Sequence, residues 1–422
     1  MSKIIKILAA GAVINLTFIT SPFAGDKDVI EVSKPEASAF STFIGDTRPF
    51  LKGRLRYEWA KIDGFDDSYV LPLRNHFGIE TGKLAGFSIL AEGEHTWIIS
   101  DPDLYNPYPG VPSTRAVIGD PENIQLNRLM VTYAGFDTKI VVGRQDVIID
   151  DQRFVGTIPW RQNDQTLDAA LIQNQSIKDL KLTYAYVEQV NRIFGELAPA
   201  RPLTRFRSDS HLIHIEYAGL PIGKIRGFGY LLDFGADSPL TRKFSTNTYG
   251  LELHGVKEIS DSGLNCTYLL TAAYQEDAGA NLVNYGTGYY RAEFGLKKEK
   301  LNGGVGAEFL TSDGGRAAFQ APISTAHAFN GFADAFLVTP DNGLRDYYVW
   351  VGASAPFKIT QKLALHYFSS DQGGDALGWE IDYVAKRKIT EHFSALLKLA
   401  FLDGSGSQPD ISRASIQVDY SY

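Results

Sequence analysis

Short segments in which apolar and polar residues alternate recur along nearly the whole of this 422-residue chain. In residues 51–59, the odd positions hold Leu, Gly, Leu, Tyr and Trp, and the even positions hold Lys, Arg, Arg and Glu. A period of two predicts β-strands with one apolar and one polar face. The alternation returns in about 18 segments, which begin near residues 50, 73, 86, 124, 138, 166, 180, 210, 223, 246, 264, 288, 301, 345, 362, 378, 393 and 412.

The connections between these segments alternate in length. Long polar stretches such as residues 98–123 and 147–165 are separated by turns of a few residues, such as 135–137. A soluble β-sandwich has no reason to sort its loops in this way. An outer-membrane barrel does, because it has short periplasmic turns and long extracellular loops. We therefore predict an all-β fold, a transmembrane antiparallel β-barrel of about 18 strands, an even number as in other single-chain bacterial barrels.

The first 24 residues resemble a secretory signal peptide, with Lys3 and Lys6 before an apolar run and a cleavage site after Ala24. A retained membrane anchor is the alternative, but the apolar run is short for a bilayer span. Residues 25–47 are predicted to be a flexible periplasmic tail, and residues 48–422 the barrel. We expect the protein in the outer membrane of a Gram-negative bacterium, in contact with lipid and lipopolysaccharide. The aromatic end at Tyr422 resembles the signal read by the barrel-assembly machinery.

Composition excludes several other classes. The net charge is −8 and there is no basic stripe, which argues against a nucleic-acid partner. Cys266 is the single cysteine, so no intramolecular disulfide forms. After the signal, no run of 18 apolar residues predicts a transmembrane helix.

Polar chemistry is concentrated in residues 141–170, which are predicted to run from a strand through a polar loop into the next strand. Arginines are interleaved there with carboxylates and amides. The arginine fork pairs with carboxylates in a fixed geometry, so the loop is a candidate binding surface for anionic or hydroxylated ligands. A salt-bridged surface loop without a ligand is the alternative interpretation.

Two stretches resemble the alginate-export family of outer-membrane porins. They are RFVGTIPWRQNDQTLDA, which ends the segment Gly143 to Asp168, and AFQAPISTAHAFNGFADAFLVTPDNGLRDYY, from Ala318 to Tyr348. The resemblance implies a monomeric barrel whose basic lumen passes anionic sugars or polymers. The pore-lining candidates that it implies, with their counter-charges, are Lys52, Arg54, Arg74, Arg128, Arg144, Arg153 and Arg161, with Asp150, Asp151 and Asp168. Trp160, inside the polar loop, is a candidate for stacking on a sugar.

We expect a channel in which small anionic or hydroxyl-rich solutes, such as saccharides or organic acids, diffuse passively past these arginines. Secretion of an anionic exopolysaccharide such as alginate is an alternative, although no periplasmic turn is long enough to plug a wide pore. Any gating would come from the outer loops at Val147 to Gln165 and Ser312 to Leu344. Several carboxylates share the lumen face, so the arginines could instead pair with neighbours and fill the barrel.

An enzyme is not expected. An outer-membrane rim hydrolase is the alternative from another class, and it would require a tight His/Asp or His/Ser cluster that the scattered histidines do not predict. No cofactor is expected. Aspartates such as Asp63, Asp66 and Asp67 lack the full spacing of a calcium loop, so no metal site is expected either.

Overall fold

A computed structural model describes residues 39–235, 239–260 and 263–422. The predicted signal peptide, residues 1–24, lies outside the described residues, as does residue range 25–38 of the predicted tail. Before the first strand, the described part of that tail contains a short helix, α1 (Ala39–Gly45).

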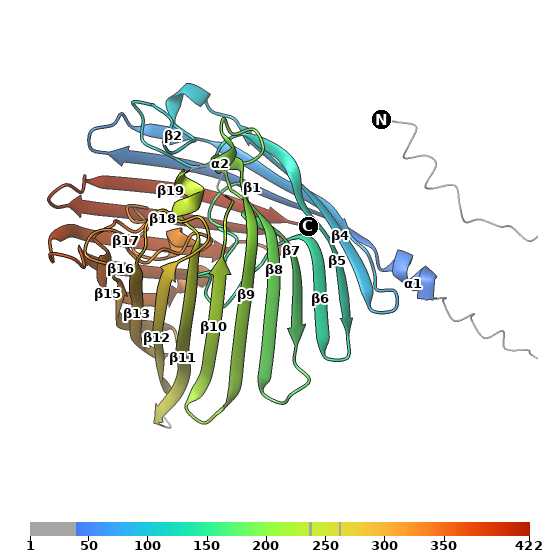
Figure 1. The fold of residues 1–422 in the computed structure, drawn as a ribbon. Helices are drawn as coiled ribbons and strands as arrows, with labels where there is room; N and C mark the ends of the chain where they lie inside the picture. Colours follow the sequence, from blue (N-terminus) through green and yellow to red (C-terminus); the bar gives the residue numbers. More distant parts are fainter. Residues whose placement is uncertain (1–38, 236–238, 261–262) are drawn as a thin grey trace, which may run out of the picture. The chain divides into compact units, whose positions relative to one another are not determined.

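The strands form one closed antiparallel sheet in which each strand pairs with its neighbours along the chain (Figure 1). The barrel closes where β1 (Arg48–Ile62) pairs with β19 (Ile411–Ser421). β2 (Ser68–Val70) and β3 (Pro72–Glu80) both pair with β1, one residue apart, and together form one stave. The 19 strand segments therefore make 18 staves, and the predicted barrel of about 18 strands is confirmed.

The remaining elements follow in chain order. The strands are β4 (Phe87–Ile98), β5 (Asn123–Gly135), β6 (Thr138–Gln145), β7 (Thr166–Asn174), β8 (Leu180–Asn191), β9 (Arg205–Leu220), β10 (Gly223–Leu232), β11 (Thr246–Ser260), β12 (Leu264–Asp277), β13 (Gly286–Lys298), β14 (Leu301–Leu310), β15 (Leu344–Ala355), β16 (Ile359–Ser369), β17 (Ala376–Lys388) and β18 (Phe393–Gly404). The short helices are η1 (Pro102–Leu104), α2 (Arg201–Thr204), α3 (Pro239–Lys243), η2 (Ala326–Ala328) and η3 (Pro356–Lys358). None of the described helices is long and apolar enough to cross a bilayer.

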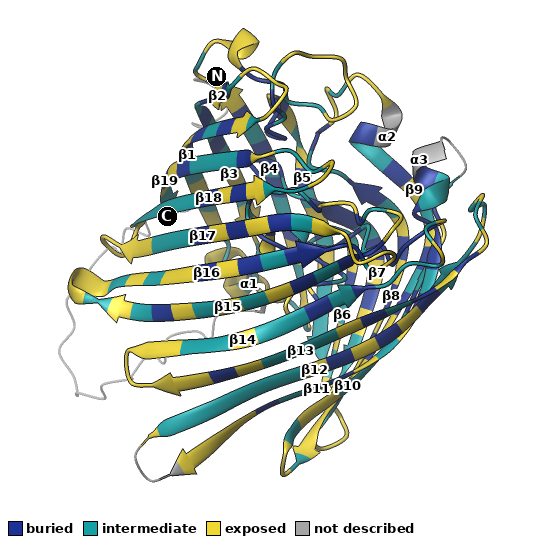
Figure 2. Cartoon of the chain, turned by 90° about the vertical axis from the view of Figure 1, so that its left-hand side faces the viewer, coloured by how far each residue is buried: buried dark blue, intermediate teal, exposed yellow. Residues whose placement is uncertain are grey.

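The alternation in the sequence becomes the two faces of the wall. On β1, Leu55 and Tyr57 are exposed on the outside, while Arg56 and Glu58 are buried on the inside. The strands of Figure 2 accordingly carry bands of exposed and buried residues. Apolar side chains thus face lipid, and polar side chains face the lumen.

The connections sort by length as predicted. The turn between β5 and β6 is residues 136–137, and the turn between β13 and β14 is residues 299–300. The connections at the other end of the barrel include residues 99–122, 146–165 and 311–343. By the usual orientation of such barrels, the long connections are extracellular.

Two of the long connections fold into the barrel. We call residues 146–165 the first inward loop and residues 311–343 the second inward loop. They pair with each other at Val155 and Ile323, and the amide of Gly156 donates to the carbonyl of Ile323 at 2.9 Å. Their buried apolar side chains join those of the wall in one cluster, whose members include Val155, Phe319, Ile323, Leu167, Phe206 and Tyr289. The lumen is therefore partly filled by protein.

We expect Leu251→Arg to lower the free energy of unfolding in lipid vesicles by about 2–4 kcal/mol, the cost of a cation on the lipid face towards the middle of the bilayer. Leu251 is 61% exposed on the outer side of β11. Leu282→Arg is the control, since Leu282 is 68% exposed but lies in a connection outside the strands. Denaturant titration measures both, and equal losses would contradict the assignment of the outer face.

Candidate functional site

The first inward loop is held to the wall by the ion pairs of two neighbouring aspartates. Asp150 Oδ2 lies 2.7 Å from His214 Nε2 on β9, and Asp150 Oδ1 lies 3.1 Å from Arg226 Nε on β10. Asp151 Oδ2 lies 2.6 Å from Arg291 Nη1 on β13. Asp150 and Asp151 thus fix the loop as counter-charges of wall arginines, which is the pairing that the alternative interpretation described.

Arg153, on the same loop, forms an ion pair with a residue of the wall. Its Nε lies 2.5 Å from Glu308 Oε1 on β14, and Nη2 donates to Asn330 of the second inward loop at 3.3 Å. Tyr289 also donates its hydroxyl to Glu308 at 2.5 Å. Arg153 is buried, so it joins the two loops and the wall and does not face a passing solute.

Arg161 has a similar role on the other side of the lumen. Nη1 lies 3.3 Å from Glu58 Oε1 on β1, and Nη2 lies 2.6 Å from Asp334 Oδ2 on the second inward loop. Burial opposes the charge of Asp334, but its pKa stays below the usual range because His327 and Arg161 face the carboxylate. The pair is therefore ionised at neutral pH.

Arginines on the β1 and β3 wall reach the loop backbone. Arg54 Nη1 donates to the carbonyl of Pro159 at 2.9 Å, and Arg56 donates to the carbonyl of Trp160. Arg54 Nε also pairs with Asp419 on β19 at 2.8 Å, and Arg74 pairs with Asp164 at 3.3 Å. On the next strands, Arg128 lies between Glu92 and Asp146, at 2.6 and 2.8 Å.

Some of these wall arginines keep contact with solvent. The side chains of Arg54, Arg74 and Arg128 are 13%, 10% and 15% exposed. Lys52 is exposed near the N-terminal end of β1, where it pairs in register with His76. These four are the predicted pore-lining cations that a solute in the lumen can reach.

Arg144 and Asp168 lie on the other face of the wall. Their register places them with Val142 and Leu129, which are 51% and 48% exposed on the lipid side. Arg144 Nε and Asp168 Oδ1 are 2.8 Å apart, so the two charges neutralise each other there. Arg144 and Asp168 were predicted to line the pore. The alternation of faces along β6 and β7 instead places both outside the lumen.

Trp160 is packed between protein groups. Its ring stacks on His327 with centroids 4.5 Å apart, and Arg56 Cζ and Lys398 Nζ each lie 3.9 Å from a ring centre. In this arrangement the ring is covered, so it offers no free platform for a sugar. The expected stacking role does not fit this geometry.

His327 is held neutral by this surrounding. Nδ1 lies 2.5 Å from Asp334, and Nε2 lies 2.7 Å from Lys398 Nζ. Burial lowers the pKa of His327 to about 3, against the raising effect of Asp334 and with the help of Lys398. The ring therefore donates from Nδ1 and accepts at Nε2 at neutral pH.

Sequence reasoning missed several partners of the inward loops. Strand alternation already placed Arg56 and Glu58 on the inner face with Arg54, so the sequence could have predicted these two. The others depend on which distant segments meet in space, and no local pattern signals them. They are Asp120, Arg226, Arg291, His327, Asp334, Lys398 and Arg413.

A pocket of about 230 Å³ opens among the long connections at the extracellular end. Its lining combines two arginines with apolar side chains, namely Arg161, Arg192, Phe194, Phe244, Leu337 and Val338. Burial lowers the pKa of Arg192 only to about 10, so the group stays charged at neutral pH. The pocket thus suits an anion with an apolar body.

The histidines do not support hydrolysis. His327, His214 and His366 each contact an aspartate, at 2.5, 2.7 and 2.9 Å. These pairs belong to the charge contacts of the lumen. Within the described residues, none of the three is hydrogen-bonded to a serine or threonine hydroxyl that could act as a nucleophile.

The fold matches solved channels. OpdK of Pseudomonas aeruginosa, solved with vanillate, has a TM-score of 0.68 and 12% identity over 90% of this chain and 99% of that one. This chain has the fold of an outer-membrane porin. OccK2 (OpdF) of the same bacterium, solved with glucuronate, matches with a TM-score of 0.67, 12% identity and coverage of 90% and 98%. OccAB2 of Acinetobacter baumannii has a TM-score of 0.67, 14% identity and coverage of 90% and 99%.

Neither a family model nor a curated protein matches the sequence. The structural neighbours are Opd and Occ channels, so the resemblance to the alginate-export family is wrong. The two motifs that suggested it lie in the inward loops and pack against the wall. The predictions of a porin fold and of the outer membrane are confirmed, and the neighbours are not enzymes.

We expect Arg153→Met to lower the free energy of unfolding by about 3–5 kcal/mol, because it leaves the buried carboxylate of Glu308 without its guanidinium. Adding Glu308→Gln removes that charge, so the double variant recovers part of the lost free energy of unfolding. Denaturant unfolding of the single and double variants in detergent tests this. A loss in the double variant equal to the sum of the losses of Arg153→Met and Glu308→Gln would show that the pair is not coupled.

We expect packing of the second inward loop to weaken as the pH falls from 6.5 towards 3. The packed His327 binds no proton in that window, whereas a released His327 binds one at its ordinary pKa, so acid favours release. Hydrogen exchange of residues 326–329, corrected for the intrinsic pH effect, measures the loss of protection. His327→Gln reduces the dependence, and the exposed-site variant His392→Gln retains it. Constant protection in the wild type would refute the assignment.

Proposed function

We propose that this barrel is a passive diffusion channel for small anionic solutes, in particular carboxylates with a hydroxyl-rich or apolar body. The observation that carries the proposal is the group of partly exposed guanidinium groups of Arg54, Arg74 and Arg128, on β1, β3 and β5 of the lumen wall. Lumen arginines favour anions because the unpaired part of their field lowers the energy of an anion in the narrow part of the pore.

The extracellular pocket supports the same solute class. Arg192 offers positive charge beside Phe194 and Phe244, whereas Arg161 is paired with Asp334 in the same lining, so a carboxylate and an apolar body could be held together at the Arg192 side. The neighbours solved with vanillate and with glucuronate support this proposal, since both ligands are small carboxylates. Contacts with lipopolysaccharide, and with the assembly machinery through Tyr422, stay predictions.

The wall also carries carboxylates, so the selectivity depends on which charges face the path. Glu252, Glu308 and Asp419 are paired with Arg226, Arg153 and Arg54. Glu380 and Asp382 instead accept hydrogen bonds from the amides of Ala333 and Phe332 in the second inward loop. Glu252, Glu308, Glu380 and Asp382 are thus taken up by internal contacts. Asp419 stays 28% exposed beside Arg54, so the selectivity depends on the balance between the arginines and their paired carboxylates.

We expect Arg54→Gln and Arg74→Gln each to lower the anion-to-cation permeability ratio by roughly twofold to fivefold. A unit charge 4 to 8 Å from a passing ion in water contributes about 0.5–1 kcal/mol. The reversal potential of the purified protein in planar bilayers under a salt gradient gives the ratio. Arg144→Gln is the matched control, because that arginine faces outward, and it should leave the ratio unchanged.

Two results would count against the proposal. A wild-type channel that prefers cations would mean that the lumen carboxylates dominate the field. An effect of Arg144→Gln equal to that of Arg54→Gln would mean that the measured selectivity does not arise from the lumen wall.

A further inference from the structure

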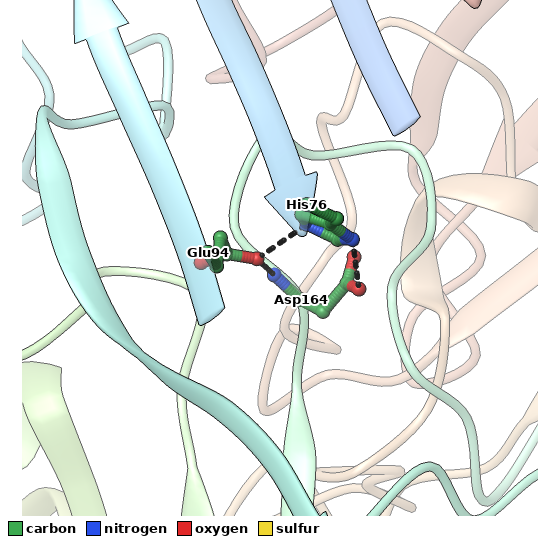
Figure 3. Close-up of side chains that lie close together, drawn as sticks. All are labelled: His76, Glu94 and Asp164. Atoms are coloured by element: carbon green, nitrogen blue, oxygen red, sulfur yellow. Dashed lines mark hydrogen bonds and ion pairs between the residues drawn. The ribbon is translucent and has the colours of Figure 1, made fainter. Parts of the chain in front are cut away.

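A group of potential metal ligands lies where the first inward loop meets the wall. His76 comes from β3, Glu94 from β4 and Asp164 from the loop, and Figure 3 shows the three side chains pointing towards one another. One ligand atom from each can be chosen so that all three lie within 4.8 Å of one another. His76 Nε2 lies 2.9 Å from Glu94 Oε2, which also accepts the amide of Asp164 at 3.0 Å.

The surroundings carry more negative than positive charge. Glu92 and Asp146 share Arg128, and Asp164 pairs with Arg74. Glu94 is fully buried, and among the ion pairs of the described residues its single partner is His76. With a neutral imidazole, four carboxylates face two guanidinium groups. A buried carboxylate in this position needs a further cation or a proton.

A buried amide, that of Asn127, lies beside the same group. Asn127 is fully buried, and its Nδ2 donates to Glu92 at 2.7 Å and to Asp164 at 3.3 Å. Its Oδ1 is buried and has no hydrogen-bond partner among the described residues. The neutral amide nitrogen of Asn127 thus faces these carboxylates, and it offsets none of their negative charge.

We propose that His76, Glu94 and Asp164 bind one divalent transition-metal ion. One imidazole nitrogen with oxygen ligands suits Zn²⁺, which forms bonds of about 2.0–2.2 Å to both. The contact of 2.9 Å between His76 and Glu94 needs to widen only to about 3.3 Å for both to reach the ion. The metal adds the missing positive charge.

Such an ion would tie the first inward loop to the wall. Asp164 is the one loop residue of the set, and β3 and β4 supply His76 and Glu94. Metal binding would therefore hold the loop in its inward position and add to the ion pairs of Arg74 with Asp164. This inference does not depend on which solute the channel passes.

The test is Zn²⁺ binding by the full chain folded in detergent. After loading and dialysis, elemental analysis is expected to give one Zn²⁺ per chain, and competition with a chromophoric chelator gives the affinity. His76→Asn and Asp164→Asn are each expected to weaken binding by about 100-fold or more, at least the effect of losing an outer-shell partner. His392→Asn, which removes a histidine at the exposed rim, is the matched control and retains binding.

Folding of each variant is checked by circular dichroism and by heat-modifiable migration on a gel. Glu94→Gln replaces any variant that does not fold. Co²⁺ substitution adds a direct readout, because ligand-field bands that disappear in Asp164→Asn place the ion at this group. The proposal is overturned if the wild type retains no Zn²⁺, if both ligand variants bind as the wild type does, or if His392→Asn alone removes the ion.

Discussion

The buried salt bridge between Arg153 and Glu308 is the contact on which the interior of this barrel depends. A guanidinium group taken out of water must meet an opposite charge and further hydrogen bonds, or the loop that carries it cannot stay inside. Glu308 on the wall and Asn330 on the second inward loop supply those partners, and Tyr289 donates a further hydrogen bond to Glu308. The same requirement explains the pairs of Asp150, Asp151 and Arg161, which face different strands.

The inward loops make two kinds of contact with the wall. Near β7 to β10, the loops bring Val155 and Phe319 against Phe206 and other apolar groups of the wall. Near β1, β3 and β19, they bring charge against charge, with Arg54 and Arg74 still open to solvent. Charge contacts also occur at β9, β10 and β13, through Asp150 and Asp151, so apolar and ionic contacts together hold the loops inside the barrel.

The mistaken family resemblance has a physical explanation. The stretch around Trp160 and Arg161 looks like a binding motif because it is dense in aromatic and polar side chains. Its side chains are dense because they pack: Trp160 stacks on His327, and Arg161 joins Glu58 to Asp334. A buried polar network and an open binding site use the same residue types, so composition alone does not separate them.

The sequence by itself determined the barrel, its strand number of about 18 and the two faces of each strand. These follow from local periodicity, because a period of two sets the face of every residue within one strand. The tertiary structure alone decided which charges meet. Arg144 was expected in the lumen, yet its register places it beside Val142 on the lipid side. Likewise, the partners of Arg161 lie 103 and 173 residues away, and only the closed barrel brings such distant charges together.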